Sequence, residues 1–132
     1  MNGQATQPDD AARALFAQAA EIRKNAYAPY SGFTVGAALL TKSGKVYLGV
    51  NTECAAYPVG CCAERNAIGA AMTAGEREFS AVAICGRHEN EPCFPCGMCR
   101  QMLAELKNPD LQVILSDGVY PLSALLPHTF TL

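Results

Sequence analysis

Two short segments of the chain combine cysteines with residues that can move protons. "CCAER" places Cys62 two residues before Glu64, and "PCGMC" carries Cys96 and Cys99 three residues apart. Both segments are expected to begin helices, where backbone N–H groups and the positive end of the helix dipole favour the thiolate form. A Cys-x-x-Cys pair by itself fits either a redox couple or half of a zinc site.

The third thiol favours a metal. Together, Cys62, Cys96 and Cys99 predict a zinc site with three thiolate ligands and a fourth position open for water, as in catalytic zinc sites. Glu64 is then expected to take a proton from that water and to pass it to a substrate. Because three thiolates give a Zn²⁺ site a net charge of about −1, a neighbouring cation should offset it. We expect Arg65 to do so by donating hydrogen bonds to a ligand sulfur.

Other interpretations of the seven cysteines stay open at this level. Cys93 stands close enough to the second pair to complete a closed, structural zinc site. Cys61 is poorly placed for this, because neighbouring residues on a helix point roughly 100° apart. A thiol redox protein would leave the first cysteine ligand and the glutamate without a role. We expect Cys54 and Cys85 to be buried as small apolar residues.

The elements that position these residues alternate along the chain. An alanine-rich helix opens it, capped by Asp9 or Asp10 and stopped by Pro29. The elements expected after it are a hairpin (33–41 and 45–51), a helix (62–75), a strand (80–86), a helix (97–107), a strand (111–116), and a small strand followed by a short helix (122–127). This order predicts an α/β fold, a three-layer α-β-α sandwich with a mixed, roughly five-stranded sheet. No linker or repeat divides the chain, so residues 1–132 are expected to form a single catalytic domain.

The composition limits the partners of the chain. Its net charge is −2, and no run of basic residues is longer than Arg23-Lys24. Because nucleic-acid binding needs clustered lysine and arginine, no nucleic acid partner is expected. The longest apolar runs, such as "VGAALL", are too short to cross a bilayer, and the first ten residues lack the features of a secretory signal. We therefore expect a cytoplasmic protein with no membrane contact. The composition is compatible with a small neutral ligand.

The segments around the cysteines resemble those of the zinc-dependent cytidine deaminases. The matching stretches are "CAER" and "PCGMCRQ", together with "PYSGFTVGAALLTKSGKVYLGVNTE", "AAYPVG" and "LLPHTF". In the zinc deaminases a glutamate that is not a ligand transfers protons, and a cysteine pair follows a proline. The resemblance covers nearly the whole chain from about residue 10, and it is to the small, three-cysteine, homotetrameric type.

The resemblance implies a cytidine deaminase-like fold, one Zn²⁺ held by the three cysteines, and Glu64 as the catalytic proton shuttle. It also implies that Asn51 and Glu53 bind the ribose hydroxyls of a nucleoside. Residues two apart on an extended segment point the same way, which supports this pair. Phe33 matches the residue whose ring packs against the pyrimidine. Phe130 matches an aromatic residue that reaches the site of a neighbouring subunit, which implies a homotetramer.

The implied reaction is the hydrolytic deamination of cytidine and 2′-deoxycytidine to uridine and 2′-deoxyuridine with release of ammonia, as in pyrimidine salvage. The alternatives are a deaminase of another cytosine nucleoside, such as a nucleoside antibiotic, and a non-catalytic module stapled by zinc. Three positions depart from the common family pattern. Cys54 stands where the family has asparagine, and Phe94 and Met98 replace smaller residues.

Overall fold

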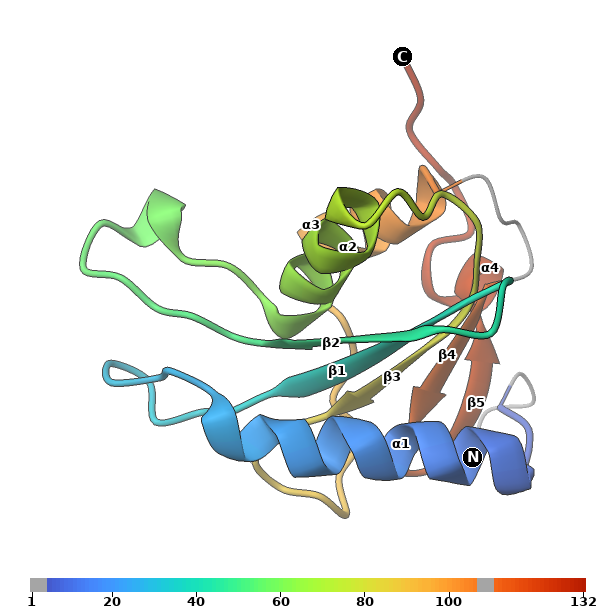
Figure 1. The fold of residues 1–132 in the computed structure, drawn as a ribbon, viewed down its shortest axis with the longest axis horizontal. Helices are drawn as coiled ribbons and strands as arrows, with labels where there is room; N and C mark the ends of the chain where they lie inside the picture. The colour runs from blue at the N-terminus through green and yellow to red at the C-terminus, as the bar shows by residue number, and fades with distance from the viewer. Residues whose placement is uncertain (1–4, 107–110) are drawn as a thin grey trace.

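The computed structural model describes residues 5–106 and 111–132, which form one mixed sheet with helices on both of its faces (Figure 1). The five strands are β1 (Gly36–Thr41), β2 (Val46–Val50), β3 (Phe79–Cys85), β4 (Gln112–Leu115) and β5 (Gly118–Pro121). They lie in the order β2-β1-β3-β4-β5. β3 and β4 are parallel, whereas the other neighbouring pairs are antiparallel. The expected hairpin and mixed sheet are confirmed.

The helices enclose two apolar layers, one on each face of the sheet. α1 (Asp10–Ile22) lies across one face, and α2 (Ala63–Thr73) and α3 (Gly97–Ala104) lie across the other (Figure 1). The layer beneath α1 is rich in alanine, whereas the layer beneath α2 and α3 holds larger side chains such as Leu39, Ile68, Phe79 and Leu103. The three-layer α-β-α sandwich is thus confirmed. None of the helices in the described part of the chain has the length and apolar character needed to span a bilayer.

α1 begins as expected but ends earlier. The Asp9 carboxylate caps its first turn by accepting a hydrogen bond from the Ala12 N–H at 2.8 Å. The helix ends at Ile22 and continues only as the 3-10 turn η1 (Arg23–Asn25), so it stops before Pro29. The chain leaves the helix because Tyr27 pairs with the segment after β2, through two backbone hydrogen bonds of 3.0 Å each.

Both helices on the other face begin at a cysteine. Cys62 is the N-cap residue of α2 and Cys96 that of α3, and each has an extended backbone. α2 is followed by Gly75, whose φ of +92° is the left-handed conformation that commonly ends a helix. α3 ends at Ala104, before the expected limit, and residue 107 lies outside the described residues. The expected short final helix is α4 (Leu122–Leu125), which ends two residues before the expected limit.

Three strand ends meet at one edge of the sheet. β1 lies between β2 and β3 and is antiparallel to both, so β2 and β3 run in the same direction. Gly36, the first residue of β1, pairs with Val50 at the end of β2 and with Cys85 at the end of β3. The segments that lead to α2 and α3 therefore leave the sheet at the edge where β1 enters it.

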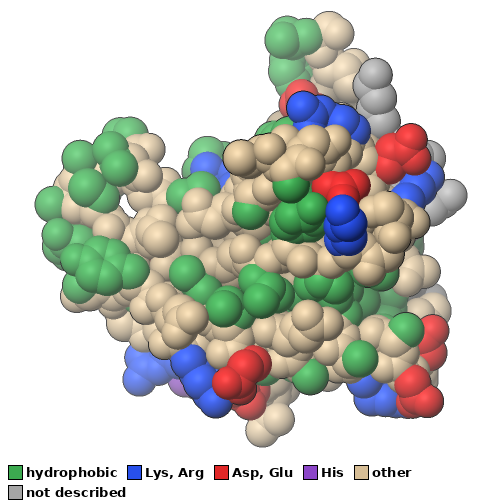
Figure 2. Space-filling view, in the orientation of Figure 1, with side chains coloured by type: hydrophobic (Ala, Val, Ile, Leu, Met, Phe, Trp, Pro, Cys, Tyr) green, Lys and Arg blue, Asp and Glu red, His purple; other side chains and the backbone are tan. Residues whose placement is uncertain are grey.

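The connection from β2 to α2 extends beyond the sheet and contains the 3-10 turn η2 (Tyr57–Val59) (Figure 1). Its base is closed by two backbone hydrogen bonds between Thr52 and Cys61, of 2.9 and 3.0 Å. Its tip carries exposed apolar side chains, with Tyr57 at 80% and Val59 at 69% exposure, and Figure 2 shows the apolar surface of this protrusion. An apolar surface gathered on a protrusion is typical of an interaction site.

Candidate active site

Three thiols come together near the edge of the sheet where β2 and β3 end. The sulfur atoms of Cys62, Cys96 and Cys99 all lie within 4.8 Å of one another, and those of Cys62 and Cys96 are 3.8 Å apart. Two sulfurs that bind one Zn²⁺ at about 2.3 Å with a tetrahedral angle lie about 3.8 Å from each other. The donor set therefore fits zinc, with sulfur on three of its four positions.

Arg65 lies beside this sulfur cluster. Its Nη2 donates to Cys62 Sγ at 3.2 Å, which is the contact expected from the sequence. Hydrogen bonds from the Cys99 thiol and from Arg65 lower the pKa of Cys62 to about 5. The hydrogen bond to Cys62 in turn raises the pKa of Cys99. The cluster thus gives up its first proton readily, which favours metal binding because a ligating cysteine must be deprotonated.

Glu64 stands in the first turn of α2, where it is only 5% exposed. Within residues 5–106 and 111–132, no other acidic or basic residue is buried. Burial raises the pKa of the Glu64 carboxyl, and the charge on Cys62 adds to this effect. A carboxyl group with a raised pKa is suited to exchanging protons near neutral pH.

The other cysteines lie outside the sulfur cluster. Burial raises the pKa of the half-buried Cys93 thiol to about 11, so this thiol stays protonated at neutral pH. Cys61 is held by its backbone pairing with Thr52. Among the residues that the structure describes, the cluster has three members, and no closed four-thiolate site forms. Cys85 is buried as expected, whereas Cys54 is half-buried and lines a surface hollow instead of the core.

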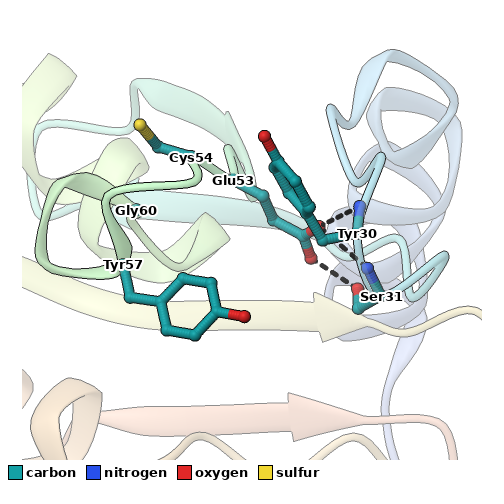
Figure 3. A pocket seen from close by; sticks show the side chains of 6 residues that line it. All are labelled: Tyr30, Ser31, Glu53, Cys54, Tyr57 and Gly60. Carbon is teal, nitrogen blue, oxygen red and sulfur yellow. Dashed lines mark hydrogen bonds between the residues drawn. The ribbon is translucent and has the colours of Figure 1, made fainter.

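Two hollows adjoin each other beside the cluster. The smaller, of about 200 Å³, is lined by Asn51, Thr52, Glu53, Gly60, Cys61, Cys62 and Arg65. The larger, of about 400 Å³, is lined by Tyr30, Ser31, Glu53, Cys54, Tyr57 and Gly60 (Figure 3). Of these two hollows, only the smaller is lined by a cysteine of the cluster, Cys62. The smaller hollow is therefore the better candidate for the reaction site, although the second hollow has the larger volume.

Asn51 ties the end of β2 to the segment that enters β1. Its Oδ1 accepts a hydrogen bond from the Val35 N–H at 2.9 Å, and its Nδ2 donates to the Phe33 carbonyl at 2.8 Å. An amide group has two N–H donors and two lone pairs, so these bonds use half of its capacity. Asn51 therefore positions the loop that carries Phe33, in addition to lining the smaller hollow.

Glu53 is held by the loop that precedes β1. Its carboxylate accepts hydrogen bonds from the backbone N–H groups of Tyr30 and Ser31, both at 3.0 Å, and from the Ser31 hydroxyl (Figure 3). These bonds, led by the one from the hydroxyl, lower the pKa of Glu53. The carboxylate is thus ionised and fixed in place, where it can accept hydrogen bonds from hydroxyl groups of a ligand.

Phe33 packs over the end of β3. Its ring meets the His88 ring edge-on, with the centroids 6.2 Å apart. A Cβ at Gly86 would lie 3.0 Å from Cys93 Cβ, 3.1 Å from Cys93 Sγ and 3.2 Å from Phe33 Cζ, so a larger residue there would press on both side chains and displace them by a few tenths of an ångström. Phe33 is still 39% exposed, and part of its ring is therefore open to a ligand.

The comparison with protein families identifies the family to which the three-cysteine cluster and the residues around it belong. The model of the cytidine and deoxycytidylate deaminase zinc-binding region matches residues 9–115. The chain therefore belongs to the cytidine and deoxycytidylate deaminase family. The matched range contains all three cysteines of the sulfur cluster, which is accordingly the zinc site of this family member, with one Zn²⁺ per chain.

Individual relatives cover most of the chain. A curated cytidine deaminase of Halalkalibacterium halodurans is 43% identical over 122 residues, which span 89% of this chain and 92% of the relative. The crystal structure of the Burkholderia pseudomallei cytidine deaminase is 46% identical and superposes with a TM-score of 0.82, over 89% of this chain and 98% of that chain. The Mycobacterium tuberculosis cytidine deaminase structure is 34% identical, with a TM-score of 0.85 over 95% and 100% of the two chains. These structures confirm the expected deaminase fold.

Three apolar residues that the sequence analysis named, Phe94, Met98 and Phe130, lie at the surface of this family member. Phe94 is 42% exposed and meets Tyr120 edge-on at 5.3 Å, and Met98 is 64% exposed on α3. Phe130 is 63% exposed in the C-terminal segment, which extends away from the sheet (Figure 1). It lines neither of the two hollows of its own chain.

Some residues that support the deaminase site had no signal that singled them out in the sequence. Ser31 lies within "PYSGF", but a serine before a glycine is also an ordinary loop pattern. Gly86 follows a buried strand, where glycine commonly ends the element. Their roles arise from contacts with Glu53 and Phe33, which are distant in the chain.

Proposed function

We propose that this protein catalyses the hydrolytic deamination of cytidine and 2′-deoxycytidine to uridine and 2′-deoxyuridine, with release of ammonia. The observation that carries the proposal is the combination of a three-sulfur zinc site with one buried carboxyl, Glu64, in the helical turn that follows Cys62. The cytidine deaminases that are 43% and 46% identical to the chain support the substrate class.

Glu64 is the group that moves protons in this proposal. Zinc, when bound, supplies an activated water that attacks C4 of the cytosine ring. Glu64 accepts a proton from that water and delivers it to N3 of the ring, which makes C4 more electrophilic. Glu64 then takes the second proton of the water, from the oxygen now bonded to C4, and gives it to the amino group, which leaves as ammonia when its bond to C4 breaks. Its raised pKa favours the protonated form between the two transfers.

The nucleoside is held, in the same proposal, by residues at the edge of the sheet. We assign Asn51 and Glu53 to the ribose hydroxyls, because both line the hollow that contains Cys62. Phe33 packs against the pyrimidine, and its partly exposed ring supports this role. Arg65 offsets the charge of the thiolates through its hydrogen bond to Cys62.

We also propose that residues 1–132 act as one catalytic domain within a homotetramer. The exposed apolar side chains of Tyr57 and Val59 and the projecting Phe130 support an assembly in which Phe130 reaches a neighbouring site. None of the seven cysteines, all of which lie among the described residues, is joined in a disulfide, which supports the reducing cytoplasm and a role in pyrimidine salvage. Sedimentation equilibrium should give four times the chain mass of 14.0 kDa, and a monomer would contradict the assembly.

Turnover and metal content test the function together. Purified protein mixed with cytidine should lower the ultraviolet absorbance of the solution, and metal analysis should find about one zinc per chain. Glu64→Gln should keep the zinc but lose activity by roughly a thousandfold, since the amide cannot exchange protons. Glu78→Gln is the matched control, because that carboxyl is exposed and its loss should leave turnover unchanged. A fully active Glu64→Gln protein would refute the mechanism.

Zinc without turnover on cytidine would contradict the proposed substrates. Comparison with other cytosine nucleosides under the same conditions then separates the two remaining candidates. Turnover of one of them would identify a deaminase of different specificity, and no turnover of any would favour a zinc-stapled module.

A further inference from the structure

Arg100, which directly follows the last cysteine of the cluster, joins two segments of the chain with its guanidinium. Its Nε donates to the Pro95 carbonyl and its Nη1 to the Leu125 carbonyl, each at 2.7 Å. We propose that Arg100 is a positioning residue for zinc, which holds the turn from Cys96 to Cys99 in ligand geometry and anchors it to the C-terminal segment. This inference depends on the zinc site but not on the identity of the substrate.

The first arm of the guanidinium closes the turn that carries two ligands. Pro95 is buried and precedes Cys96, the N-cap residue of α3. The Arg100 N–H donates to the Cys96 carbonyl at 2.9 Å, and the Arg100 side chain donates to the preceding carbonyl, that of Pro95. The turn is therefore closed twice by one residue. A buried carbonyl left without its donor costs about 1–3 kcal/mol, which opposes displacement of the turn.

The second arm fixes the turn relative to the C-terminal segment. The last carbonyls of a helix have no partner within that helix, and Arg100 provides one for Leu125 at the end of α4. The start of α4 is itself tied to the residue before β4 by a backbone hydrogen bond of 2.9 Å. The next residue after Arg100 adds a further tie, because Gln101 Nε2 donates to the Phe130 carbonyl at 2.8 Å. Two consecutive residues after the last ligand thus fasten the C-terminal segment to α3.

Arginine is the side chain that suits this position. The guanidinium is planar, and its N–H donors diverge at fixed angles, so one group can serve carbonyls from two different segments. A lysine places its donors on a single nitrogen, so we expect Arg100→Lys to retain one of the two bonds. Methionine has a comparable apolar stem and no donor, so Arg100→Met removes both bonds while it keeps most of the packing.

The expected consequence is faster loss of zinc. Residues that orient metal ligands typically change metal affinity or activity by 10- to 100-fold when they are mutated. Cys62 stays in place on α2, so the effect arises from the two ligands in the turn. We expect Arg100→Met to release zinc roughly 10 to 100 times faster than the unaltered protein, and Arg100→Lys to lie between the two.

The experiment measures zinc release from the full chain purified with its zinc. An excess of a chromophoric chelator takes up the metal, and the absorbance of the complex gives the rate constant. Arg77→Met is the matched control, because Arg77 Nη1 also donates to two carbonyls, those of Met72 and Glu76, at 3.1 and 2.8 Å. Met72 lies in the last turn of α2 and Glu76 just beyond it, at the end of the helix remote from the cysteines, so the loss of these bonds should leave the release rate unchanged.

A second measurement separates positioning from a general loss of stability. The Co²⁺-substituted protein reports the geometry of its sulfur ligands in the visible spectrum, which should shift in Arg100→Met and Arg100→Lys but not in Arg77→Met. If the rate of zinc release and the visible spectrum of the Co²⁺-substituted protein are both unaltered in Arg100→Met, the inference is overturned. If Arg100→Met does not fold, the lysine variant decides: a release rate and spectrum like those of the unaltered protein would overturn it. A protein that holds zinc normally but does not deaminate would contradict the proposed function and leave this inference standing.

Discussion

Replacement of Asn51 by alanine should impair both the stability of the fold and the binding of the nucleoside. The Asn51 amide makes two hydrogen bonds to the backbone, with the Val35 N–H at 2.9 Å and with the Phe33 carbonyl at 2.8 Å. Each contributes about 1 kcal/mol, so their joint loss should lower the free energy of unfolding by about 2 kcal/mol. For a chain of this size, that corresponds to a fall in Tm of roughly 5–10 °C.

The ribose contact adds a separate effect on substrate binding. Loss of a hydrogen bond of about 1.4 kcal/mol raises KM for cytidine by about tenfold. Asn66→Ala is the matched control, because Asn66 Nδ2 donates to the Val50 carbonyl at 2.7 Å, at the end of the same strand, but lines neither hollow. Both variants should lower Tm, measured at fixed protein concentration with zinc present, and only Asn51→Ala should raise KM.

The effects of Asn51→Ala on stability and on substrate binding would be contradicted by different results. An Asn51→Ala protein with an unchanged Tm would show that the two backbone hydrogen bonds contribute nothing net to stability. An equal rise in KM for Asn51→Ala and Asn66→Ala would show that the effect on binding comes from the loosened strand end and not from a contact with the ribose.

Two further substitutions test the loops around the site. Ser31→Ala should move the acid limb of the KM profile to higher pH. The Ser31 hydroxyl lowers the pKa of Glu53, so its loss raises that pKa toward the ordinary 4.5, and binding then weakens at a higher pH as the carboxylate is protonated. An unchanged KM–pH profile would contradict the role of Glu53. Gly49→Ala should lower the yield of folded protein and its Tm, because a Cβ there collides with the backbone of Ala63 and Ala67, and an unaltered Tm would refute this close packing.

The chemistry of the site was predictable because its residue types and local spacing specify it. Cys62 and Cys96 each precede a stretch with helical pattern, and both are the N-cap residues of their helices. The short spacing from Cys96 to Cys99 places the second ligand in the first turn of α3 by local geometry alone. The helix alone places these two cysteines near each other, so the sequence is sufficient for that part, whereas the contact of Arg100 with Leu125, which we propose helps to fix their ligand geometry, comes from the fold.

The remaining features depend on contacts between residues that are distant in the chain. The end of α1 was predicted at Pro29 from local preferences, but Tyr27 pairs with the segment after β2 and ends the helix earlier. Glu53 was identified from its resemblance to a family pattern, whereas its partner Ser31 comes from another loop. Periodicity and spacing describe one element at a time, and they carry no information on which loops become neighbours.

The order of the strands explains why residues so far apart in the sequence form one site. β1 lies between β2 and β3, so the carboxyl ends of β2 and β3 flank the point where β1 begins. Phe33 precedes β1, Asn51 and Glu53 follow β2, and the two helices that begin at cysteines follow the connections from β2 and β3. Both helix N-termini therefore converge on the same edge, and their dipoles favour thiolates there. If β1 lay outside the β2–β3 pair, the cysteines would still cap their helices. The segment that carries Phe33, however, would then not lie between the ends of β2 and β3.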